Sequence, residues 1–126
     1  SHQWPAYPGT GLTTETGIAR NVVNAPLPPG SGSAEFRHGY TATILPALRR
    51  FAPELLILSA GFDAHERDPL AQINLQTDDY AWVTRELLAV ARDCAQGRVV
   101  SCLEGGYDLQ ALASSVAVHV QELMRA

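Results

Sequence analysis

The chain has 126 residues, 46% of them hydrophobic, which suits one domain with an apolar core. Its net charge is −4 and its nine basic residues form no cluster, which argues against a nucleic-acid-binding protein. No apolar run approaches the roughly 18 residues that a membrane span needs, and no signal peptide is visible. Cys94 and Cys102 have the spacing of neither a metal pair nor a disulfide framework, so two buried thiols are expected. We therefore expect a cytoplasmic protein without a nucleic-acid or membrane partner.

The first 32 residues show neither helical nor strand periodicity. The segment from Trp4 to Gly11 combines aromatic rings with proline and glycine, which fix a loop that exposes its rings. Two interpretations stay open for this loop. Its rings cover the core, or they form the rigid aromatic wall of a substrate channel.

A first helix is predicted to begin near Ser33, a good N-cap residue, and to end before Pro53. An apolar residue recurs every fourth position and predicts a stripe that faces the core: Phe36, Tyr40, Ile44 and Leu48. Pro46 predicts a kink or a break within this segment, because proline lacks an N–H and clashes with the preceding turn.

The stretch over residues 55–70 is the one around which the rest of the chain is organised. It begins with a continuous apolar run over residues 55–58, which is typical of a parallel strand covered on both faces. Gly61 then opens a loop whose polar residues are Asp63, His65, Glu66 and Asp68. Ligands of α/β sheets bind at the carboxyl ends of strands, and Asp and His side chains suit a divalent metal. A solvated or helix-capping acidic loop is the alternative.

A second helix is predicted from Thr77, as its N-cap, to Gly97, and a second strand over residues 98–103. Asp108 then caps a third helix. The apolar face expected for this third helix consists of Leu109, Leu112, Val116, Val120 and Leu123.

This alternation of helices and strands predicts an α/β fold with parallel strands and right-handed crossovers. Parallel neighbours place the loops 61–70 and 104–108 at one edge of the sheet, so Asp68 and Tyr107 can face one site. So few strands would leave a bare sheet edge and half-covered faces. We therefore expect further chain or a partner subunit to complete the sheet.

The loop after the second strand carries Gly105, Gly106 and Tyr107. Paired glycines let the backbone approach a ligand closely and adopt unusual φ values. A tyrosine hydroxyl held by such a turn is a good donor to a developing oxyanion. The alternative is a tight turn followed by a boundary aromatic residue.

Several motifs now coincide in order: Pro8-Gly-Thr-Gly11 after His2-Gln3, Val23-Asn-Ala-Pro-Leu27, Ser59-Ala-Gly-Phe-Asp-Ala-His-Glu-Arg-Asp-Pro-Leu70 and Leu103-Glu-Gly-Gly-Tyr-Asp108. This ordered set resembles the histone deacetylase superfamily, especially its class II-like bacterial members and the acetylpolyamine amidohydrolases. The resemblance covers essentially all of residues 1–126 but corresponds only to the C-terminal portion of the family's catalytic domain. It implies an arginase-like three-layer α/β/α fold with a parallel sheet.

The same resemblance implies zinc-dependent hydrolysis of an N-acetyl amide, with acetyl-lysine or a small acetylated amine as the substrate. Asp68 then resembles an aspartate ligand of zinc, and Tyr107 the catalytic tyrosine that binds the acetyl carbonyl and the oxyanion. Tyr7 resembles an aromatic residue that lines the acyl channel, while Gly105 and Gly106 resemble glycines of the channel wall. A structural K⁺ or Na⁺ is a further expectation.

The family's paired histidines and its Asp-x-His zinc ligands belong to upstream segments that have no counterpart in this sequence. A catalytic zinc needs about three protein ligands, and the resemblance supplies one. We therefore expect the isolated chain to be inactive, and to form a homo-oligomer or associate with the missing N-terminal portion. One alternative is a non-catalytic α/β interaction module derived from this fold. Another is a manganese amidohydrolase of the related arginase fold, although its binuclear metal site would require more carboxylate ligands.

Overall fold

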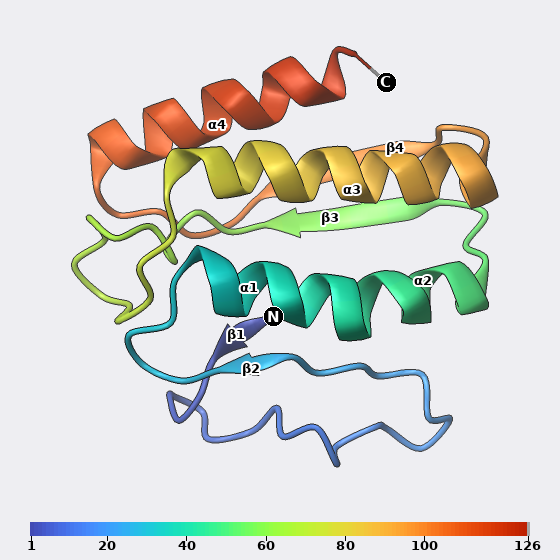
Figure 1. Cartoon of the computed structure of the whole chain (residues 1–126), viewed down its shortest axis with the longest axis horizontal. Coiled ribbons are helices and arrows are strands. Elements are labelled where there is room, and N and C mark those ends of the chain that lie inside the picture. Colours follow the sequence, from blue (N-terminus) through green and yellow to red (C-terminus); the bar gives the residue numbers. More distant parts are fainter. Residues whose placement is uncertain (126) are drawn as a thin grey trace.

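The computed structural model describes residues 1–125. Its elements in chain order are β1 (His2–Gln3), β2 (Pro26–Leu27), α1 (Ser33–Gly39), the π-helical η1 (Tyr40–Ile44), α2 (Leu45–Phe51), β3 (Leu56–Ala60), α3 (Thr77–Ala95), β4 (Val99–Leu103) and α4 (Leu109–Leu123). Figure 1 shows α3 running along the β3–β4 pair, with α4 on one side of it and α1 and α2 on the other. The segment that contains β1 and β2 lies beyond α1 and α2, away from α4.

The strands form two separate parallel pairs, β1 with β2 and β3 with β4. In the second pair the register runs from Leu56 opposite Val99 to Ala60 opposite Leu103. Main-chain hydrogen bonds continue past the strand ends, because the N–H of Phe62 donates to the carbonyl of Gly105 at 2.7 Å. The predicted parallel arrangement is confirmed, and the two following loops leave the same edge of the sheet.

The β3–β4 pair has one covered face and one open face. Leu56 and Leu58 are buried against residues of α3, whereas Ile57 is 65% exposed and its partner Val100 is 48% exposed. This alternation is that of a sheet packed on one side. The prediction of a strand covered on both faces is therefore wrong within residues 1–125, and the expectation of half-covered faces is confirmed.

The first helical segment passes Pro46 without a break. The turn ahead of it, η1, is π-helical, and Pro46 lies in the first turn of α2. A wider turn gives the proline ring room and accommodates its missing N–H. The N-cap of α1 is Gly32 rather than the predicted Ser33, and the Gly32 N–H donates to the Glu35 carboxylate at 2.9 Å. The predicted kink thus takes the form of a π-helical turn.

A buried carboxylate joins the start of α3 to α1. Asp79 is 0% exposed and accepts from the N–H of Gln76, the N-cap of α3, at 3.0 Å. It also accepts from the Ser33 hydroxyl at 2.5 Å and pairs with the Arg37 guanidinium at 2.8 Å. Every charge at this buried point has a partner, as a buried ion pair requires. The N-cap of α3, Gln76, lies one residue before the predicted Thr77.

The buried face of α4 is polar, which differs from the apolar stripe that the spacing predicted. Its buried residues are Ala111, Ser115, His119 and Glu122. Leu109, by contrast, is 79% exposed and Val120 is 43% exposed. Leu112 and Val116 do pack against the core, so part of the predicted stripe is confirmed.

His119 connects α4 to α3 and β4 through its two ring nitrogens. Thr84 donates its hydroxyl to the Tyr80 carbonyl at 2.6 Å, so it accepts from His119 Nδ1 at 2.7 Å. The remaining nitrogen, Nε2, then accepts from the Ser101 hydroxyl at 2.9 Å. Burial lowers the pKa of His119. The histidine is therefore a neutral structural group.

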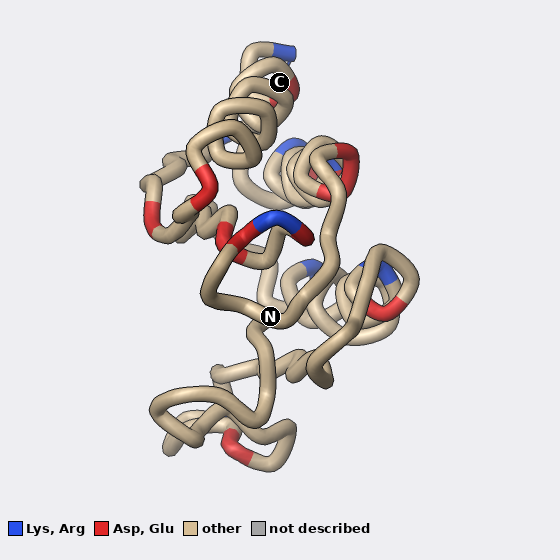
Figure 2. The backbone as a smooth tube through the Cα atoms, turned by 90° about the vertical axis from the view of Figure 1, so that its left-hand side faces the viewer, with Lys and Arg blue, Asp and Glu red and all other residues tan. Residues whose placement is uncertain are grey.

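Charged residues are spread over several elements rather than gathered into one stripe (Figure 2). Within residues 1–125, no helix combines the length and apolar character that crossing a membrane requires. Cys94 and Cys102 are both free thiols, but Cys94 is half-buried and Cys102 is exposed, so the prediction of two buried thiols is wrong.

Candidate functional site

A cavity of about 1060 Å³ extends along β3 to the loops that follow β3 and β4. Its lining includes Asp63 from the first loop, Gly105 and Tyr107 from the second loop, and Tyr7 from the N-terminal segment. Because β3 and β4 are parallel, both loops reach the cavity from the same sheet edge. The structure thus brings together four of the residues that sequence reasoning singled out.

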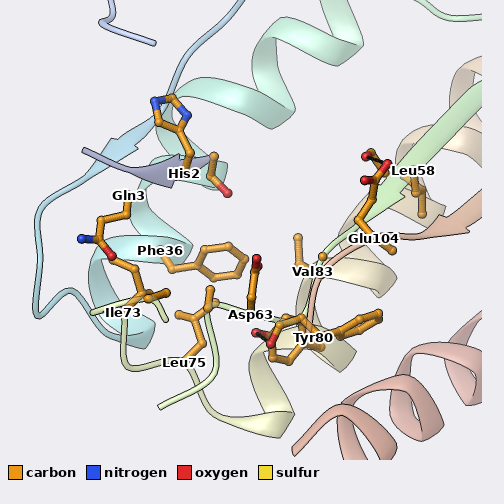
Figure 3. A pocket seen from close by; sticks show the side chains of 18 of the residues that line it. His2, Gln3, Phe36, Leu58, Asp63, Ile73, Leu75, Tyr80, Val83 and Glu104 are labelled. Atoms are coloured by element: carbon orange, nitrogen blue, oxygen red, sulfur yellow. Dashed lines mark hydrogen bonds between the residues drawn. The ribbon is translucent and has the colours of Figure 1, made fainter. Parts of the chain in front are cut away.

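Asp63 is a cavity-lining carboxylate whose oxygens are available to a ligand. It lies in the first turn after β3, and Figure 3 shows its side chain among Phe36, Val83 and Tyr80. Within residues 1–125 its carboxylate takes part in no hydrogen bond or ion pair. Gly105 comes so close that a Cβ there would collide with Asp63 Oδ2. An unpaired, half-buried carboxylate beside bare backbone is suited to a cation.

Asp68 occupies a different kind of position. It is 8% exposed and does not line the cavity. Its Oδ1 accepts from the N–H of Leu70 at 2.9 Å and of Ala71 at 3.5 Å, while its Oδ2 accepts from the N–H of Tyr107 at 2.9 Å. A buried carboxylate is satisfied by such main-chain donors. The hydrogen bonds of Asp68, the predicted zinc ligand, are those of a residue that stabilises the loops. Asp63 is the carboxylate of this loop that is available to a metal.

The two glycines before Tyr107 have different surroundings. Gly105 lines the cavity, as expected for a channel wall, but Gly106 does not. Gly106 has a φ of +150°, and a Cβ there would lie 2.7 Å from Leu112 Cδ1 and 3.4 Å from Phe62 Cβ. Its close contacts are thus with α4 and the first loop. The structure supports the predicted wall position for Gly105 and gives Gly106 the role of a tight packing point.

Tyr107 and Tyr7 both line the cavity with exposed rings. Tyr107 is 56% exposed and Tyr7 is 99% exposed. The indole nitrogen of Trp4, on the same loop as Tyr7, is buried. Both interpretations of this aromatic loop therefore stay predictions: the Trp4 indole nitrogen is buried, and Tyr7 lines the cavity. Residues 1–125 alone do not enclose the Tyr7 ring.

Phe62, which directly precedes Asp63, is fixed on several sides. Its carbonyl accepts from the Tyr80 hydroxyl at 3.1 Å. Its ring centroid lies 5.1 Å from that of Tyr80 and 5.7 Å from that of His119. Burial, followed by the charges of three nearby aspartates, raises the pKa of Tyr80, so its phenol stays a donor. The sequence analysis assigned no role to the Tyr80 hydroxyl, which supports the site by holding the Phe62 carbonyl.

The other polar residues of the first loop are engaged elsewhere. His65 is 5% exposed; its Nδ1 accepts from the N–H of Arg67 at 3.2 Å and its Nε2 lies 3.3 Å from Thr77 Oγ1. Glu66 is exposed and accepts from Gln76 Nε2 at 2.5 Å. Neither residue lines the cavity. The acidic loop therefore does not gather its four polar side chains around one point.

The residues described here can supply part of a metal site. In residues 1–125, no three His, Cys, Asp or Glu side chains are grouped so that they could hold a metal ion. Asp63 fits one ligand, because its oxygens are free and face the cavity. A catalytic zinc needs about three protein ligands. The donor set is thus compatible with one ligand of a divalent cation.

Comparison with known proteins identifies the family. Residues 1–123 match the histone deacetylase domain. The chain belongs to the histone deacetylase family. An uncharacterized protein of Synechocystis sp. is 42% identical over 98% of this chain and 39% of its own length. Histone deacetylase 14, chloroplastic, of Arabidopsis thaliana is 39% identical over 98% of this chain and 30% of its own length.

Solved structures of deacetylases share the fold. The HDA15 HD domain has a TM-score of 0.84 and 32% identity, over 94% of this chain and 34% of that one. An acetylpolyamine aminohydrolase from Burkholderia pseudomallei has a TM-score of 0.79 and 31% identity, over 93% of this chain and 34% of that one. These likenesses confirm the predicted arginase-deacetylase fold class. The chain spans the C-terminal part of the deacetylase domain and well under half the length of these relatives.

Asp63 could have been found from the sequence by its distance from the strand. In this α/β deacetylase fold the cavity opens directly at the carboxyl end of β3, and Asp63 follows that end within one turn. Asp68 lies later in the loop, where the chain has already turned away. The aspartate nearer the strand end is the better candidate ligand.

Proposed function

We propose that the protein that carries this chain is a zinc-dependent deacetylase that hydrolyses an N-acetyl amide. Family membership supports amide hydrolysis. The observation that carries the proposal is that Asp63 and Tyr107, from loops after two different strands, line one cavity. A free carboxylate and a free phenol at one place are what metal-assisted acyl hydrolysis needs.

Asp63 would be one ligand of the zinc ion, and the remaining ligands would come from the upstream part of the domain. When bound, zinc supplies Lewis-acid polarisation of a carbonyl and lowers the pKa of a coordinated water. We propose Asp63 for this role in place of Asp68, because both carboxylate oxygens of Asp68 already accept hydrogen bonds from main-chain N–H groups.

Tyr107 would donate its phenolic O–H to the acetyl carbonyl oxygen. This bond strengthens as water adds to the carbonyl carbon and negative charge develops on the oxygen; the C–N bond then breaks, releasing acetate and the free amine. One such donor is worth about 10²–10³ in rate. A side chain at Gly105 would collide with the Asp63 carboxylate, so a glycine here lets the carboxylate keep its position beside the second loop.

The substrate class we propose is acetyl-lysine or a small acetylated amine. The printed names of the relatives support this class, since they include a histone deacetylase and an acetylpolyamine aminohydrolase. Both names describe an acetyl group on an amine at the end of an alkyl chain. Tyr7, fully exposed at the cavity, offers a ring face along which such a chain could lie.

We also propose that residues 1–126 alone hydrolyse no acetyl amide and bind zinc weakly. The isolated position of the Asp63 carboxylate supports this proposal, since the residues described contain no group of three metal-binding side chains. Equilibrium dialysis of the isolated chain against zinc tests it. Tight binding of one zinc per chain would contradict it.

Turnover of Tyr107→Phe in the intact protein tests the proposed function. We expect kcat to fall by about 10²–10³, with the zinc content unchanged, because the hydroxyl is not a ligand. Thr41→Val is the control, since it removes an exposed hydroxyl of η1 that does not line the cavity. Unchanged kcat in Tyr107→Phe would remove Tyr107 from the mechanism. A parent protein that hydrolyses no acetylated amine would favour the non-catalytic interaction module.

A further inference from the structure

The loop that carries Tyr107 has little support from its own residues. It is short, it contains two glycines, and Gly106 adopts a positive φ of 150°. Two of its main-chain bonds are made with the other strand and loop, by Glu104 N–H to the Ala60 carbonyl and by the Gly105 carbonyl to Phe62 N–H. The bond nearest to the phenol is the one from the N–H of Tyr107 to Asp68 Oδ2.

We propose that Asp68 is a positioning residue for Tyr107, which it holds through that main-chain N–H. The proposal rests on the proposed role of Tyr107 as the donor to the acetyl carbonyl. Asp68 then acts on the reaction without touching zinc or substrate. A carboxylate 39 positions earlier in the chain fixes the residue from which the phenol projects.

The bond between Asp68 and Tyr107 is of a strong kind. It is 2.9 Å long and its acceptor residue is 8% exposed. Hydrogen bonds to an ionised acceptor are roughly twice as strong as neutral ones, and a poorly hydrated environment strengthens them further. Asp68 is itself immobile, because its other oxygen accepts from Leu70 and Ala71. The acceptor end of the bond is therefore fixed, and it can hold the less supported Tyr107 end.

The other side-chain contacts between the two loops are less able to hold the backbone of Tyr107 in place. Arg67 reaches the Asp108 carboxylate only at 3.5 Å and Gln110 Oε1 at 2.8 Å, and the Arg67 side chain is 49% exposed. Exposed ion pairs of this kind contribute little. The Ser59 hydroxyl donates to Glu104 at 2.7 Å, but at the far end of the second loop from Tyr107. Asp68 is thus the buried side chain that holds the Tyr107 end.

The position of the Tyr107 backbone matters for catalysis, because the phenolic O–H must lie within hydrogen-bond distance of the acetyl carbonyl oxygen as negative charge develops on it. A misplacement of about 1 Å can cost a factor of about 10² in rate. Without the Asp68 bond, the glycine-rich loop could rotate and carry the phenol with it. The loss should appear in kcat rather than in zinc binding.

Asp68→Asn in the intact protein is the first test, with kcat, KM and zinc content measured together. The amide can still accept on one side but presents N–H groups on the other. We expect kcat to fall about 10- to 100-fold, with zinc content unchanged. Glu66→Gln is the matched control, since it makes the same change at an exposed carboxylate of the same loop. Loss of zinc in Asp68→Asn, or unchanged kcat, would overturn the proposal.

Asp68→Ser separates the two duties of the carboxylate. A serine hydroxyl can keep a local turn with Leu70 but is too short to reach Tyr107 as well. We expect the same loss of kcat with zinc retained. This variant replaces Asp68→Asn if the latter does not fold, and parental kcat in Asp68→Ser would overturn the proposal.

A double-mutant cycle decides whether Asp68 acts through Tyr107. If it does, adding Asp68→Asn to Tyr107→Phe should lower kcat no further, because the hydroxyl to be positioned is already gone. Losses that multiply would overturn the positioning role and leave the proposed function standing. Parental kcat in Tyr107→Phe would overturn both.

Discussion

The two loops at the sheet edge differ in how much of their geometry they supply themselves. The loop over residues 61–70 is bonded internally, from the His65 N–H to the Phe62 carbonyl at 3.3 Å and from the Asp68 N–H to the His65 carbonyl at 2.8 Å. The loop over residues 104–108 has two glycines, and its Tyr107 N–H donates to a side chain of the first loop. The first loop therefore acts as the scaffold on which the second is placed. Substitutions in the first loop should therefore affect both Asp63 on that loop and Tyr107 on the second loop.

Asp63→Asn should have the largest effect and tests the first loop as the source of the metal ligand. We expect zinc affinity to fall by more than about 10²-fold, because loss of a ligand should exceed the 10–100-fold that outer partners contribute. Competition against a chromogenic chelator measures it in the intact protein. Asp93→Asn, an exposed aspartate on α3, is the control. Retention of zinc by Asp63→Asn with loss in Asp68→Asn would reverse the roles assigned to the two aspartates.

Gly105→Ala tests the closest approach between the loops. A Cβ at this position would collide with Asp63 Oδ2, so the carboxylate or the second loop must move. Overpacking of this kind costs about 1–3 kcal/mol, and we expect about a tenfold loss of zinc affinity. Gly39→Ala is the matched control, since its Cβ would meet only Ala25 Cβ at 3.7 Å. Unchanged zinc affinity and kcat would mean that the loops are looser than their contacts indicate.

Tyr80→Phe tests the support beneath the first loop. It removes the hydroxyl that donates to the Phe62 carbonyl at 3.1 Å and keeps the ring that packs on Phe62. One such bond contributes about 1 kcal/mol, so we expect that loss in the free energy of unfolding. Urea denaturation measures it. The loss should not exceed this value, because the Phe62 carbonyl keeps its bond from His65. No measurable change would show that this support is dispensable.

The pH dependence of stability should show the smallest effect and concerns His119, whose hydrogen bonds are made to α3 and β4 rather than to either loop. Burial lowers the pKa of His119 in the folded chain, so the unfolded state binds more protons below its ordinary value of about 6.5. The free energy of unfolding should therefore decrease as pH falls below about 6.5 and level off above it. Urea denaturation between about pH 5 and 8 should give a shallower slope for His119→Gln, and an unchanged slope for the exposed His38→Gln. Equal slopes for parent and His119→Gln would contradict this assignment.

Sequence patterns predicted the elements well because local signals fix them. Asp108 does cap α4, accepting from the Ala111 N–H at 2.8 Å, and the order of helices and strands specified parallel pairing. The family motif placed Tyr107 and Gly105 at the cavity. These inferences depend on residues that are close together in the chain or on an ordered set of motifs.

The remaining features depend on partners that are distant in the sequence. The local sequence does not show that Asp68 is already occupied, because one group that donates to it is a main-chain N–H on another loop. Likewise, His119 is buried because Thr84 and Ser101 meet its two nitrogens, and hydrophobic periodicity does not register polar pairs. Spacing therefore placed Leu112 and Val116 correctly against the core but missed the polar residues that are buried on α4.

The polar face of α4 also determines where that helix begins. Its His119 and Glu122 each meet matched groups on α3 or β4, so a slip of one turn, about 5.4 Å, would separate these partners. A wholly apolar face would tolerate such a slip, whereas buried polar pairs specify one register. Since Asp108 opens α4 directly after Tyr107, the same register sets the point at which the chain leaves the second loop. The register of α4 on α3 and β4 thereby helps to fix the position in space from which the Tyr107 side chain projects.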